Sequence, residues 1–452
     1  MTSIKRFKVE ADALKELTSN EKRIIPLLIK AAELTDKIFV LQENYVNNGA
    51  NFYPRDAIKS EIEEAARKDP KIFSPFTVVK RDIKNNLIAI PFHNEYEKEI
   101  APIVKVIDQA EKICSNKSFK NYLSAVNLAL SEGKYQEADI AWLKVQDSNI
   151  HFTIGPYERY LDKLFFIKRA YQASVGVIDS KKTEKSQFVR DILYTTFGTR
   201  QHRIISPTIV DMQVVRCFIF SGLLGRLMFT RQYLPSETET IEKHGSRILG
   251  YLTAIDYKFN KLVYPIFNAV FESNFKARYS KELLHKGNYY YVLLNSLVQH
   301  LHRYRDSRGR LRELFPIFDE ANNSVSGIQH AKHLVLKGII DQKELEAIMV
   351  IQICWIFSEW VLSKKSSLRD GYLKGDALTF NFLKREGALQ EKDGISWPNF
   401  AKMFFEMENL SVIFSRYLEE GSYLEAQEFL SKYLTFEPLR AFDKRLENIK
   451  PL

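Results

Sequence analysis

Cysteine is scarce in this chain, and the few cysteines present support neither of their usual structural roles. The 452 residues include only three, which are Cys114, Cys217 and Cys354. Each stands in an apolar stretch and none forms a Cys-x-x-Cys pair. The sequence therefore provides neither a disulfide framework nor a thiolate metal site, and we expect a reducing compartment and a cytoplasmic protein.

Long apolar runs are also missing. The N-terminal stretch MTSIKRFKVEADALKEL has no apolar core, so we expect no secretory signal. The most apolar run, AIMVIQICWIF at 347–357, is too short to span a bilayer and predicts a buried helix. We therefore expect no membrane partner.

Acidic residues do not balance the basic ones, and the formal net charge is +10. Most lysines and arginines alternate with acids along predicted helical faces, and no recognisable nucleic-acid module accompanies them, so we expect no nucleic-acid partner. The exception is RYRDSRGRLR at 303–312, with five arginines. Because arginine forks suit carboxylates and phosphates, this segment is a candidate anion site. A solvated loop followed by a helix start is the alternative.

Length and composition are those of a globular protein with more than one lobe. The chain is about three times the length of a typical domain. Hydrophobic residues make up 45% and charged residues 27% of it, which is enough apolar material for a substantial core.

Helical periodicity dominates, with apolar residues three and four apart in stretches such as 21–46 and 120–145. Strand signals cluster in the first half. The stretch 76–92 predicts a hairpin around DIKNN, whereas 149–157 and 203–210 predict single strands that end at Gly or Pro.

After about residue 212 the patterns predict mainly helices. The predicted fold class is therefore mainly α with a smaller mixed α/β part (α+β). We predict a mixed N-terminal lobe over 1–211 and a helical lobe over 212–452, with a boundary that is soft by tens of residues. In one version of this prediction the C-terminal tail returns to the first lobe.

The stretch NSLVQHLHRYRDSRGRLRELFPIFDEANNSV, 295–325, has the outline of a zinc-peptidase site. An apolar helical run ends in polar residues, and DEA opens a second predicted helix. Such a site takes two imidazoles from one helix turn and a carboxylate from the next helix. A glutamate beside the first histidine acts as general base on the metal-bound water.

Several stretches resemble the dipeptidyl-peptidase-III family of zinc peptidases, in its shorter bacterial-type branch. They are SPFTVVKRD…NLIAIPFHNEY (74–96), ADIAWLKVQDSNIHFTIGPYERYLDKLFFIKRAYQA (138–173), DEANNSVSGIQHAKHLVLKGIID (319–341) and GDALTFNFLKREGAL (375–389). The segment around IGPYERYLDKLF is the most specific. The resemblance runs from about residue 50 to about 435, and it implies two lobes separated by a wide cleft, with the metal site in the helical lobe.

The family's catalytic motif, HExxGH or HExxH, is degenerate here. The resemblance places the first histidine at Asn295 and the general base at Ser296. The second histidine falls at Gln299 or at His300, depending on the spacing, and the third ligand is Glu320. A neutral amide is a poor zinc ligand, and serine cannot accept a proton near neutral pH as glutamate does.

Three supporting positions follow from the same resemblance. The acidic neighbour of the third ligand is Asp319, the outer acid that would support the site falls at Ser324, and a further functional histidine falls near Tyr372. We therefore expect no bound cofactor and no ordinary zinc peptide hydrolysis.

A rebuilt zinc site is the alternative. It would use His300 and Glu320 together with a further histidine from the following set: His285, His302, His330 and His333. His330 and His333 are three apart on one predicted helix, which lets two rings share a face. Hydrogen-bonded structural histidines on a semi-buried helix are the competing interpretation.

Ligand contacts are expected in two places. In the family the IGPYERYLDKLFF segment lies along the cleft, so Tyr157, Glu158 and Asp162 are expected to face a ligand. A tight Gly-Pro turn with buried aromatic residues is the alternative. A positive wall of the cleft is predicted from His300 and four arginines: Arg303, Arg305, Arg308 and Arg310.

Two functions remain open. In the first, the chain is a catalytically inactive peptidase homologue that binds a peptide, an anionic small molecule or a protein partner in the former active cleft. In the second, it is a metal-dependent peptidase or other hydrolase with a noncanonical site on Glu320 and His300.

Overall fold

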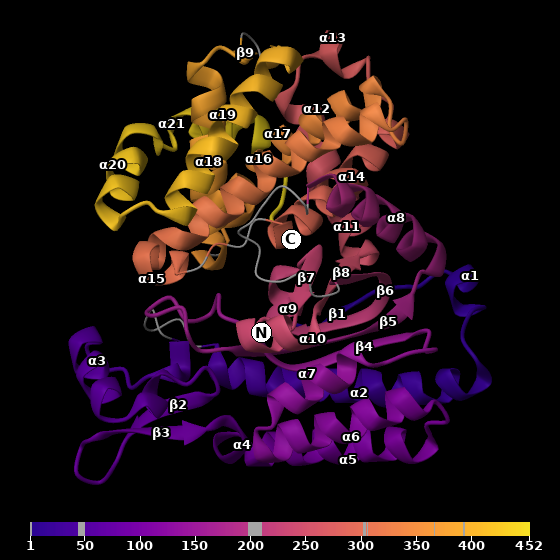
Figure 1. The fold of residues 1–452 in the computed structure, drawn as a ribbon, viewed down its shortest axis with the longest axis vertical. Helices are drawn as coiled ribbons and strands as arrows, with labels where there is room; N and C mark the ends of the chain where they lie inside the picture. The colour runs from indigo at the N-terminus through magenta and orange to yellow at the C-terminus, as the bar shows by residue number, and fades with distance from the viewer. Residues whose placement is uncertain are drawn as a thin grey trace. The chain divides into compact units, whose positions relative to one another are not determined.

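The protein, seen here as a computed structural model (Figure 1), is described for residues 2–43, 50–197, 210–301, 304, 306–365, 367–391 and 394–452. It forms two compact units. The first comprises the described residues up to Glu184 and those from 210 to Thr253. The second comprises the described residues from Lys185 to the end of helix α8 and those from Ala254 to Leu452. The first unit therefore extends beyond the boundary predicted at residue 211. The C-terminal tail, which one version of the prediction returns to the first lobe, is grouped with the second unit.

A six-stranded mixed sheet forms the centre of the first unit. Its strands lie in the order β4 (Ile150–Glu158), β5 (Ala170–Ile178), β6 (Val210–Gly222), β8 (Ser246–Tyr251) and β7 (Arg231–Leu234), with β1 (Lys5–Arg6) also paired to β6. Strands β6 and β8 are parallel, and the other pairs are antiparallel. The two ends of this order meet, because Gln232 Nε2 on β7 donates to Glu158 Oε1 on β4 at 3.0 Å. The sheet is therefore curled on itself.

Five of these six strands were not predicted: β1, β5, β6, β7 and β8. Most of β6 and all of β7 and β8 lie after about residue 212, where the patterns predict mainly helices. That prediction is wrong for this stretch, although Val210, Met212 and Val214 alternate as buried positions along β6. The predicted strand at 203–210 lies outside the described residues except for Val210.

The strand predicted at 149–157 is confirmed as β4, but it continues through Gly155 and Pro156. The tight Gly-Pro turn considered for this segment is wrong. Instead, the register against β5 shifts between Pro156 and Glu158, as in a β-bulge. The predicted hairpin is confirmed as β2 (Thr77–Arg81) and β3 (Leu87–Pro91).

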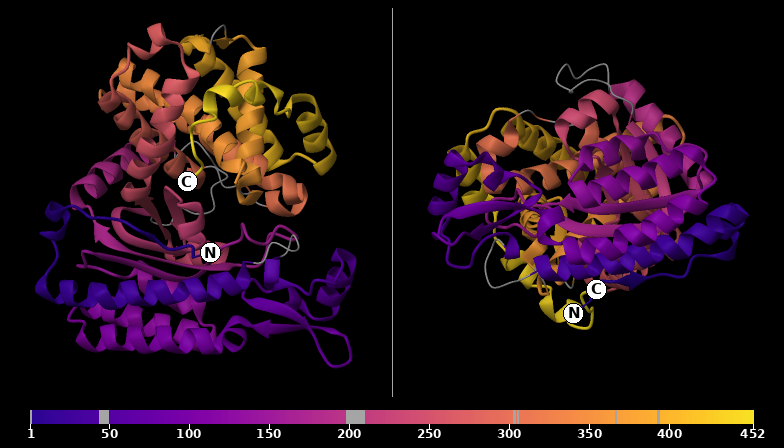
Figure 2. Two further views of the ribbon diagram at one scale, coloured as in Figure 1. Left: turned by 180° about the vertical axis from the view of Figure 1, so that it is seen from behind. Right: turned by 90° about the horizontal axis from the view of Figure 1, so that it is seen from below.

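Helices cover the outer face of the curled sheet. Helix α2 (Ser19–Gln42) packs on β5 and β6, with α5 (Glu97–Ile113) and α6 (Lys117–Glu132) on its far side, as the views from behind and below show (Figure 2). Thr18 and Glu21 form a capping box that fixes where α2 begins. The remaining helices of this unit are α1 (Ala11–Leu14), α3 (Lys59–Lys68), α4 (Phe92–Glu95), α7 (Tyr135–Leu143), α9 (Leu223–Leu227) and α10 (Thr238–His244).

The second unit is helical, with a short ladder of β9 (Leu389–Glu391) and β10 (Ile395–Pro398). Its longer helices are α8 (Ser180–Phe197, which starts in the first unit), α14 (Lys281–Leu301), α16 (Phe315–Leu336), α17 (Gln342–Ser363), α18 (Asp370–Arg385), α19 (Phe400–Glu419) and α20 (Tyr423–Tyr433). The shorter ones are α11 (Leu252–Lys258), α12 (Tyr264–Val270), α13 (Ser273–Lys276), α15 (Ser307–Leu311), α21 (Glu437–Arg440) and α22 (Asp443–Leu446). The predicted fold class, mainly α with a smaller mixed part, is confirmed.

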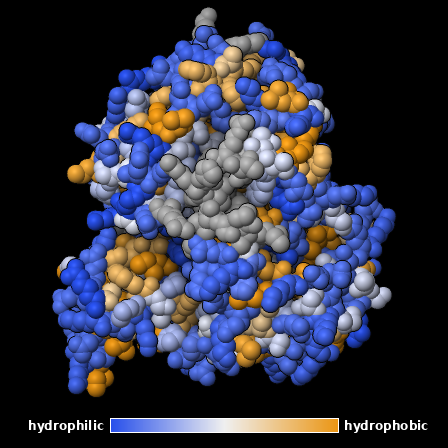
Figure 3. Space-filling view, in the orientation of Figure 1, coloured by the Kyte–Doolittle hydropathy of each residue, from blue (hydrophilic) through white to orange (hydrophobic). Residues whose placement is uncertain are grey.

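Helix α17 contains the apolar run at 347–357 and is a core helix, as predicted. Among the described residues it is the one helix long and apolar enough to cross a membrane, but 83% of its most apolar window is buried inside the protein. It packs against α14, α16 and α18. On the face shown in Figure 3, hydrophilic residues predominate and apolar residues appear only in small groups.

Candidate functional site

Asn295, where the resemblance places the first zinc ligand, lies at a close contact between α14 and α16. Asn295 is 3% exposed. A β-carbon on Gly327 of α16 would collide with Asn295 Oδ1 and would lie 3.2 Å from the Asn295 backbone nitrogen. Glycine at 327 therefore permits this helix contact. The Asn295 carboxamide is packed against the neighbouring helix instead of facing an open site.

Ser296, at the general-base position, is buried and engaged within its own helix. Its hydroxyl donates to the Val292 carbonyl at 2.6 Å, the usual backward bond of a helical serine. A hydroxyl held in this way supplies neither a carboxylate nor a base.

Glu320, at the third-ligand position, lies on α16 seven residues before Gly327, about 10 Å along the helix axis. Its charge acts on Asp376 of α18, where α18 approaches α16 closely. A β-carbon on Gly375 would lie 2.8 Å from the Ile317 carbonyl oxygen.

Asp376 titrates unusually because protein atoms surround its carboxyl, although part of the residue reaches solvent. Burial, followed by the negative charges of Glu359 and Glu320, raises its pKa well above the usual value, and Arg369 opposes the shift. Glu320 thus belongs to a group of acids around Asp376 at the contact between α16 and α18.

Arg369 balances part of this negative charge. Its Nε donates to Glu359 Oε2 at 2.5 Å, and its guanidinium carbon lies 4.4 Å from the centre of the Tyr372 ring. Tyr372 is the position at which the resemblance places a further functional histidine. Its ring instead packs against the guanidinium of Arg369, which forms a buried ion pair with Glu359.

The outer-acid position, Ser324, belongs to a neutral network between three helices. Its hydroxyl lies 2.9 Å from the Tyr291 hydroxyl and accepts from Gln352 Nε2 at 3.1 Å. No charge of either sign is present in these contacts, so they would not support a metal-bound imidazole.

The histidines considered for a rebuilt site have different surroundings. His285 Nε2 lies 2.8 Å from Asp256 Oδ1, and His330 Nδ1 lies 2.7 Å from the Ser326 carbonyl within α16. His302 and the side chains of Gln299 and His300 lie outside the described residues. In the part of the chain that is described, no group of three or more His, Cys, Asp or Glu is arranged to hold a metal ion.

The described residues at the ligand and base positions do not fit a zinc ion. Protein zinc sites use imidazole, thiolate and carboxylate ligands. Here Asn295 offers an amide packed against a helix, Ser296 a hydroxyl bonded to its own helix, and Glu320 a carboxylate near Asp376.

Arg310, predicted as part of a positive wall, instead caps helix α19. Its Nη2 donates to the carbonyls of Leu418 and Glu419 at 2.7 Å each, and its Nη1 donates to the Gly421 carbonyl at 2.5 Å. These carbonyls lie at the end of a helix, where backbone acceptors lack intrahelical partners. The guanidinium of Arg310 is thus held in this cap, and its contact with a ligand stays a prediction.

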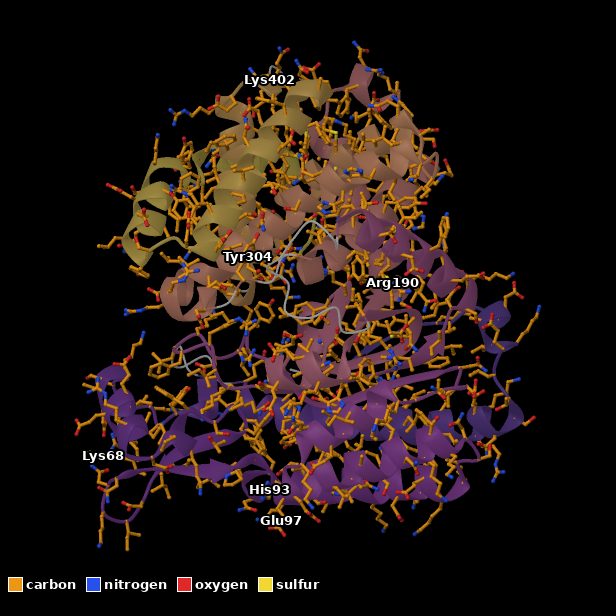
Figure 4. The ribbon with its side chains drawn as sticks, viewed as in Figure 1. Lys68, His93, Glu97, Arg190, Tyr304 and Lys402 are labelled. Carbon is orange, nitrogen blue, oxygen red and sulfur yellow. The ribbon has the colours of Figure 1, made fainter. Side chains whose placement is uncertain are left out.

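The rest of the arginine-rich segment is only partly described. Arg308 is exposed on the short helix α15, with its guanidinium carbon 5.2 Å from the centre of the Phe315 ring. Tyr304, labelled in Figure 4, donates its hydroxyl hydrogen to Ser415 Oγ on α19 at 2.7 Å. Arg303 and Arg305 lie outside the described residues, so Arg308 is the described arginine of the four that is fully on the surface.

Asp162 of the IGPYERYLD segment is a structural residue. It is fully buried, and its Oδ2 accepts from the backbone of Ile167 and Lys168 and from the Tyr53 hydroxyl at 2.9–3.0 Å. Its Oδ1 accepts two more backbone bonds, at 3.1 Å, from Leu164 and Phe165. Both oxygens hold the turn after β4, and a ligand contact of Asp162 stays a prediction.

Tyr157 and Glu158 are the other two residues of this segment that are predicted to face a ligand. The Tyr157 hydroxyl donates to the Ile154 carbonyl at 3.3 Å, and burial raises its pKa well above the usual value. Glu158 is partly exposed and accepts from Gln232. Of the three residues predicted in this segment, Tyr157 and Glu158 are partly exposed and Asp162 is buried.

Asp139 is a titratable group that sequence patterns did not single out. Burial raises its pKa to about 7, with a smaller contribution from Glu237, and Arg169 opposes the shift. Arg169 is 1% exposed and its guanidinium is paired with Glu237. The sequence signal, an aspartate between the apolar positions of EADIAWL, is too common to mark a site by itself.

Two solved bacterial structures share this architecture over nearly their whole length. Dipeptidyl peptidase III from Caldithrix abyssi superposes with a TM-score of 0.83 at 22% identity, covering 99% of this chain and 97% of that chain. The chain has the dipeptidyl-peptidase-III fold. The enzyme from Corallococcus sp. strain EGB gives a TM-score of 0.84 at 19% identity, covering 99% of this chain and 94% of that chain.

A curated plant protein is also similar to this dipeptidyl-peptidase-III-like chain. Nudix hydrolase 3 of Arabidopsis thaliana is 25% identical over 447 residues, which cover 89% of this chain and 56% of the plant protein. The chain therefore spans just over half the length of the curated relative that it matches. No protein-family model matches the sequence.

Proposed function

We propose that this chain is a catalytically inactive protein with the dipeptidyl-peptidase-III fold, which binds a peptide, an anionic small molecule or a protein partner without hydrolysing it. One observation carries the proposal. The first-ligand and general-base positions, Asn295 and Ser296, are buried side chains engaged with helices. A metal-bound water would find neither its imidazole nor its base at these positions.

The ligand class is supported by the charged groups that the described surfaces offer. Arg308 is an exposed guanidinium on α15, suited to a carboxylate or phosphate. Glu158 is a partly exposed carboxylate on the first unit, suited to a cationic group. Each end of a peptide carries one of these charges, so a peptide suits either group taken by itself.

The alternative is a hydrolase with a rebuilt metal site on Glu320 and His300. Glu320 is near Asp376, in a group of acids that a cation would neutralise. Replacing Glu320 by alanine separates the two functions. The inactive binding protein would keep its stability and its ligand affinity, whereas a rebuilt hydrolase would lose its metal and its activity.

The plant relative's name refers to a Nudix hydrolase, and this chain spans just over half of that protein, so we do not propose that activity for it.

The test of the proposal is an assay for dipeptide release. The purified protein is incubated with short peptides that have free N-termini, with and without one equivalent of zinc, and the products are followed by mass spectrometry.

We expect no dipeptide release above the buffer blank under either condition. Calorimetric titration of the same peptides, with Glu320→Ala as the matched variant, measures binding separately. Zinc-dependent dipeptide release that is lost in Glu320→Ala would replace this proposal with the rebuilt hydrolase.

A further inference from the structure

The inside of the curled sheet of the first unit is lined by polar side chains together with the buried ring of Phe220, which pairs in register with Ser174. Alternate residues of a strand face opposite sides of a sheet. On β5, Tyr171 faces the helices, where its hydroxyl lies 2.8 Å from that of Tyr135. Gln172 and Ser174 alternate with Tyr171 and Ala173 along the strand, so their side chains face the other side of the sheet, which is the inside. The inward polar residues are each at most 4% exposed: His151, Thr153, Gln172, Ser174, Gln232 and Tyr251.

Most of these side chains form one hydrogen-bonded chain. The Ser174 hydroxyl lies 2.7 Å from His151 Nε2, 2.8 Å from the Thr153 hydroxyl and 3.5 Å from the Tyr251 hydroxyl. The Tyr251 hydroxyl donates to Gln232 Oε1 at 2.7 Å.

Gln232 Nε2 then donates to Glu158 Oε1 at 3.0 Å. Glu158 is partly exposed, whereas every member before it is buried. The chain therefore leads from the interior of the curled sheet to solvent.

Two inward side chains have polar atoms with no hydrogen-bond partner among the described residues. They are Gln172, with both its amide nitrogen and its amide oxygen, and His151, with Nδ1. Gln172 is 0% exposed and His151 is 2% exposed. Native proteins leave very few buried polar atoms unsatisfied, and internal water is the usual partner where protein atoms do not serve.

The backbone leaves room beside Gln172. Its register partners are Gly155 on β4 and Gly222 on β6, so neither neighbouring strand places a side chain next to it. A β-carbon built on Gly155 would meet nothing nearer than the Tyr157 ring, at 3.6 Å, whereas one built on Gly222 would collide with the Tyr171 carbonyl oxygen and the Gln172 α-carbon. The space for a small molecule beside Gln172 therefore lies on the β4 side.

The chemistry of the lining selects the occupant. An amide nitrogen requires an acceptor, and an amide oxygen requires a donor, so the occupant must both accept and donate. Burial, with the nearby Arg247 charge, lowers the pKa of His151 to about 3, so its ring is neutral near pH 7. The groups that lack partners, the Gln172 amide and the neutral His151 ring, favour neither an anion nor a metal cation.

We infer that the inside of the curled sheet is a hydrated chamber, in which internal water molecules bind the Gln172 amide and His151 Nδ1. These waters complete the polar chain from His151 to Glu158. The chamber is a feature of the first unit alone and is independent of whether the second unit has lost its peptidase chemistry.

The test compares two buried glutamines of the full-length protein. Gln172→Met keeps the length of the side chain and removes both polar atoms. Gln42→Met is the matched control, because Gln42 is also 0% exposed but its Oε1 accepts from the Tyr171 backbone at 2.8 Å and its Nε2 donates to the Arg169 carbonyl at 3.4 Å. Thermal unfolding gives the Tm of each variant, and a high-resolution crystal structure of the unmodified protein shows the chamber directly.

If the chamber is hydrated, Gln172→Met leaves the water without its hydrogen-bond partners and lowers Tm by several degrees, as Gln42→Met does. The crystal structure shows ordered water within hydrogen-bond distance of the Gln172 amide. In a dry chamber, Gln172→Met removes two unsatisfied groups and raises Tm, whereas Gln42→Met still lowers it. A raised Tm, or an amide without water, would overturn the inference, and the crystal structure alone decides if the variant does not fold.

Discussion

Asn295 on α14 and Gly327 on α16 are in direct contact, with no room between them for a β-carbon. This contact distinguishes a substituted motif from a metal site that has merely lost its ion. If only the ligand chemistry had changed, Asn295 would line an open site. Instead its carboxamide is part of a helix–helix interface, and Gly327 is the residue that makes this interface possible.

Replacing Gly327 by alanine tests the contact. The added β-carbon must displace Asn295 or separate the helices, so we expect the free energy of unfolding to fall by about 1–3 kcal/mol. Urea denaturation measures this change. Adding Asn295→Ala should recover part of the loss, because the truncated side chain no longer meets the new methyl group.

The matched control is Gly309→Ala on α15. A β-carbon there would meet nothing within 4 Å, so we expect a change within about 1 kcal/mol, in the stabilising direction that alanine favours in helices. Equal losses at the two glycines would contradict the account of the Asn295 contact.

Arg310 should matter for folding and not for ligand binding. Arg310→Met removes donors from the carbonyls of Leu418, Glu419 and Gly421 at the end of α19. Losing charge-assisted bonds of this kind should lower the free energy of unfolding by about 1.5–3 kcal/mol. Arg308→Met, on the same short helix but exposed, should change stability by less than about 1 kcal/mol. The reverse order in urea denaturation would restore Arg310 as a surface group.

Asp162 should be equally sensitive, because its two oxygens accept five hydrogen bonds in the turn after β4. Asparagine supplies one acceptor oxygen, and its amide NH2 would face backbone donors. Asp162→Asn should therefore lower the free energy of unfolding by about 1.5–3 kcal/mol. Asp56→Asn is the control, because Asp56 pairs with Arg81 while 67% of its side chain is exposed. It should cost no more than about 1 kcal/mol. Similar small losses at both positions would show that the Asp162 turn is not held as described.

Asp139 should give the stability of the first unit a distinctive pH dependence. Its folded-state pKa is about 7, above the usual 3.8, so the folded protein holds this proton more tightly than the unfolded chain does. The resulting stabilisation is fully present below about pH 4 and is lost as the pH rises through about 7.

Asp139→Asn cannot ionise and does not lose this contribution. The stability of the variant relative to the unmodified protein should therefore increase between about pH 5 and pH 8, by roughly 1–4 kcal/mol. The lower part of this range is expected because Asp139 is partly exposed. Urea denaturation at a series of pH values measures the difference, and a difference that is independent of pH would show that Asp139 titrates normally.

Sequence patterns predicted the elements whose signals are local. The hairpin of β2 and β3 has two β-branched runs around a polar turn, and α17 has an apolar run of helical length with a capping box at Asp341 and Glu344. Strand β6 alternates buried and half-exposed residues over VDMQV, but it was assigned to a helical region because its partners β5 and β8 are distant in sequence.

Site roles were harder to predict because they depend on contacts between segments that are far apart in sequence. Arg310 lies in a cluster of arginines that suggests an anion site, yet its partners are carbonyls more than a hundred residues away. Asp162 is similar: the motif suggests a ligand contact, whereas its oxygens accept backbone hydrogen bonds from the turn after β4, a role that the local pattern does not reveal. The resemblance correctly predicted the fold, because fold-defining residues are spread over the whole chain.

The metal content of freshly purified, untagged protein, measured by elemental mass spectrometry before and after chelation, tests the central claim most directly. The account predicts zinc and other transition metals far below one ion per chain in both samples. Near-stoichiometric zinc that chelation removes would contradict it, and would indicate a rebuilt metal site on Glu320 and His300.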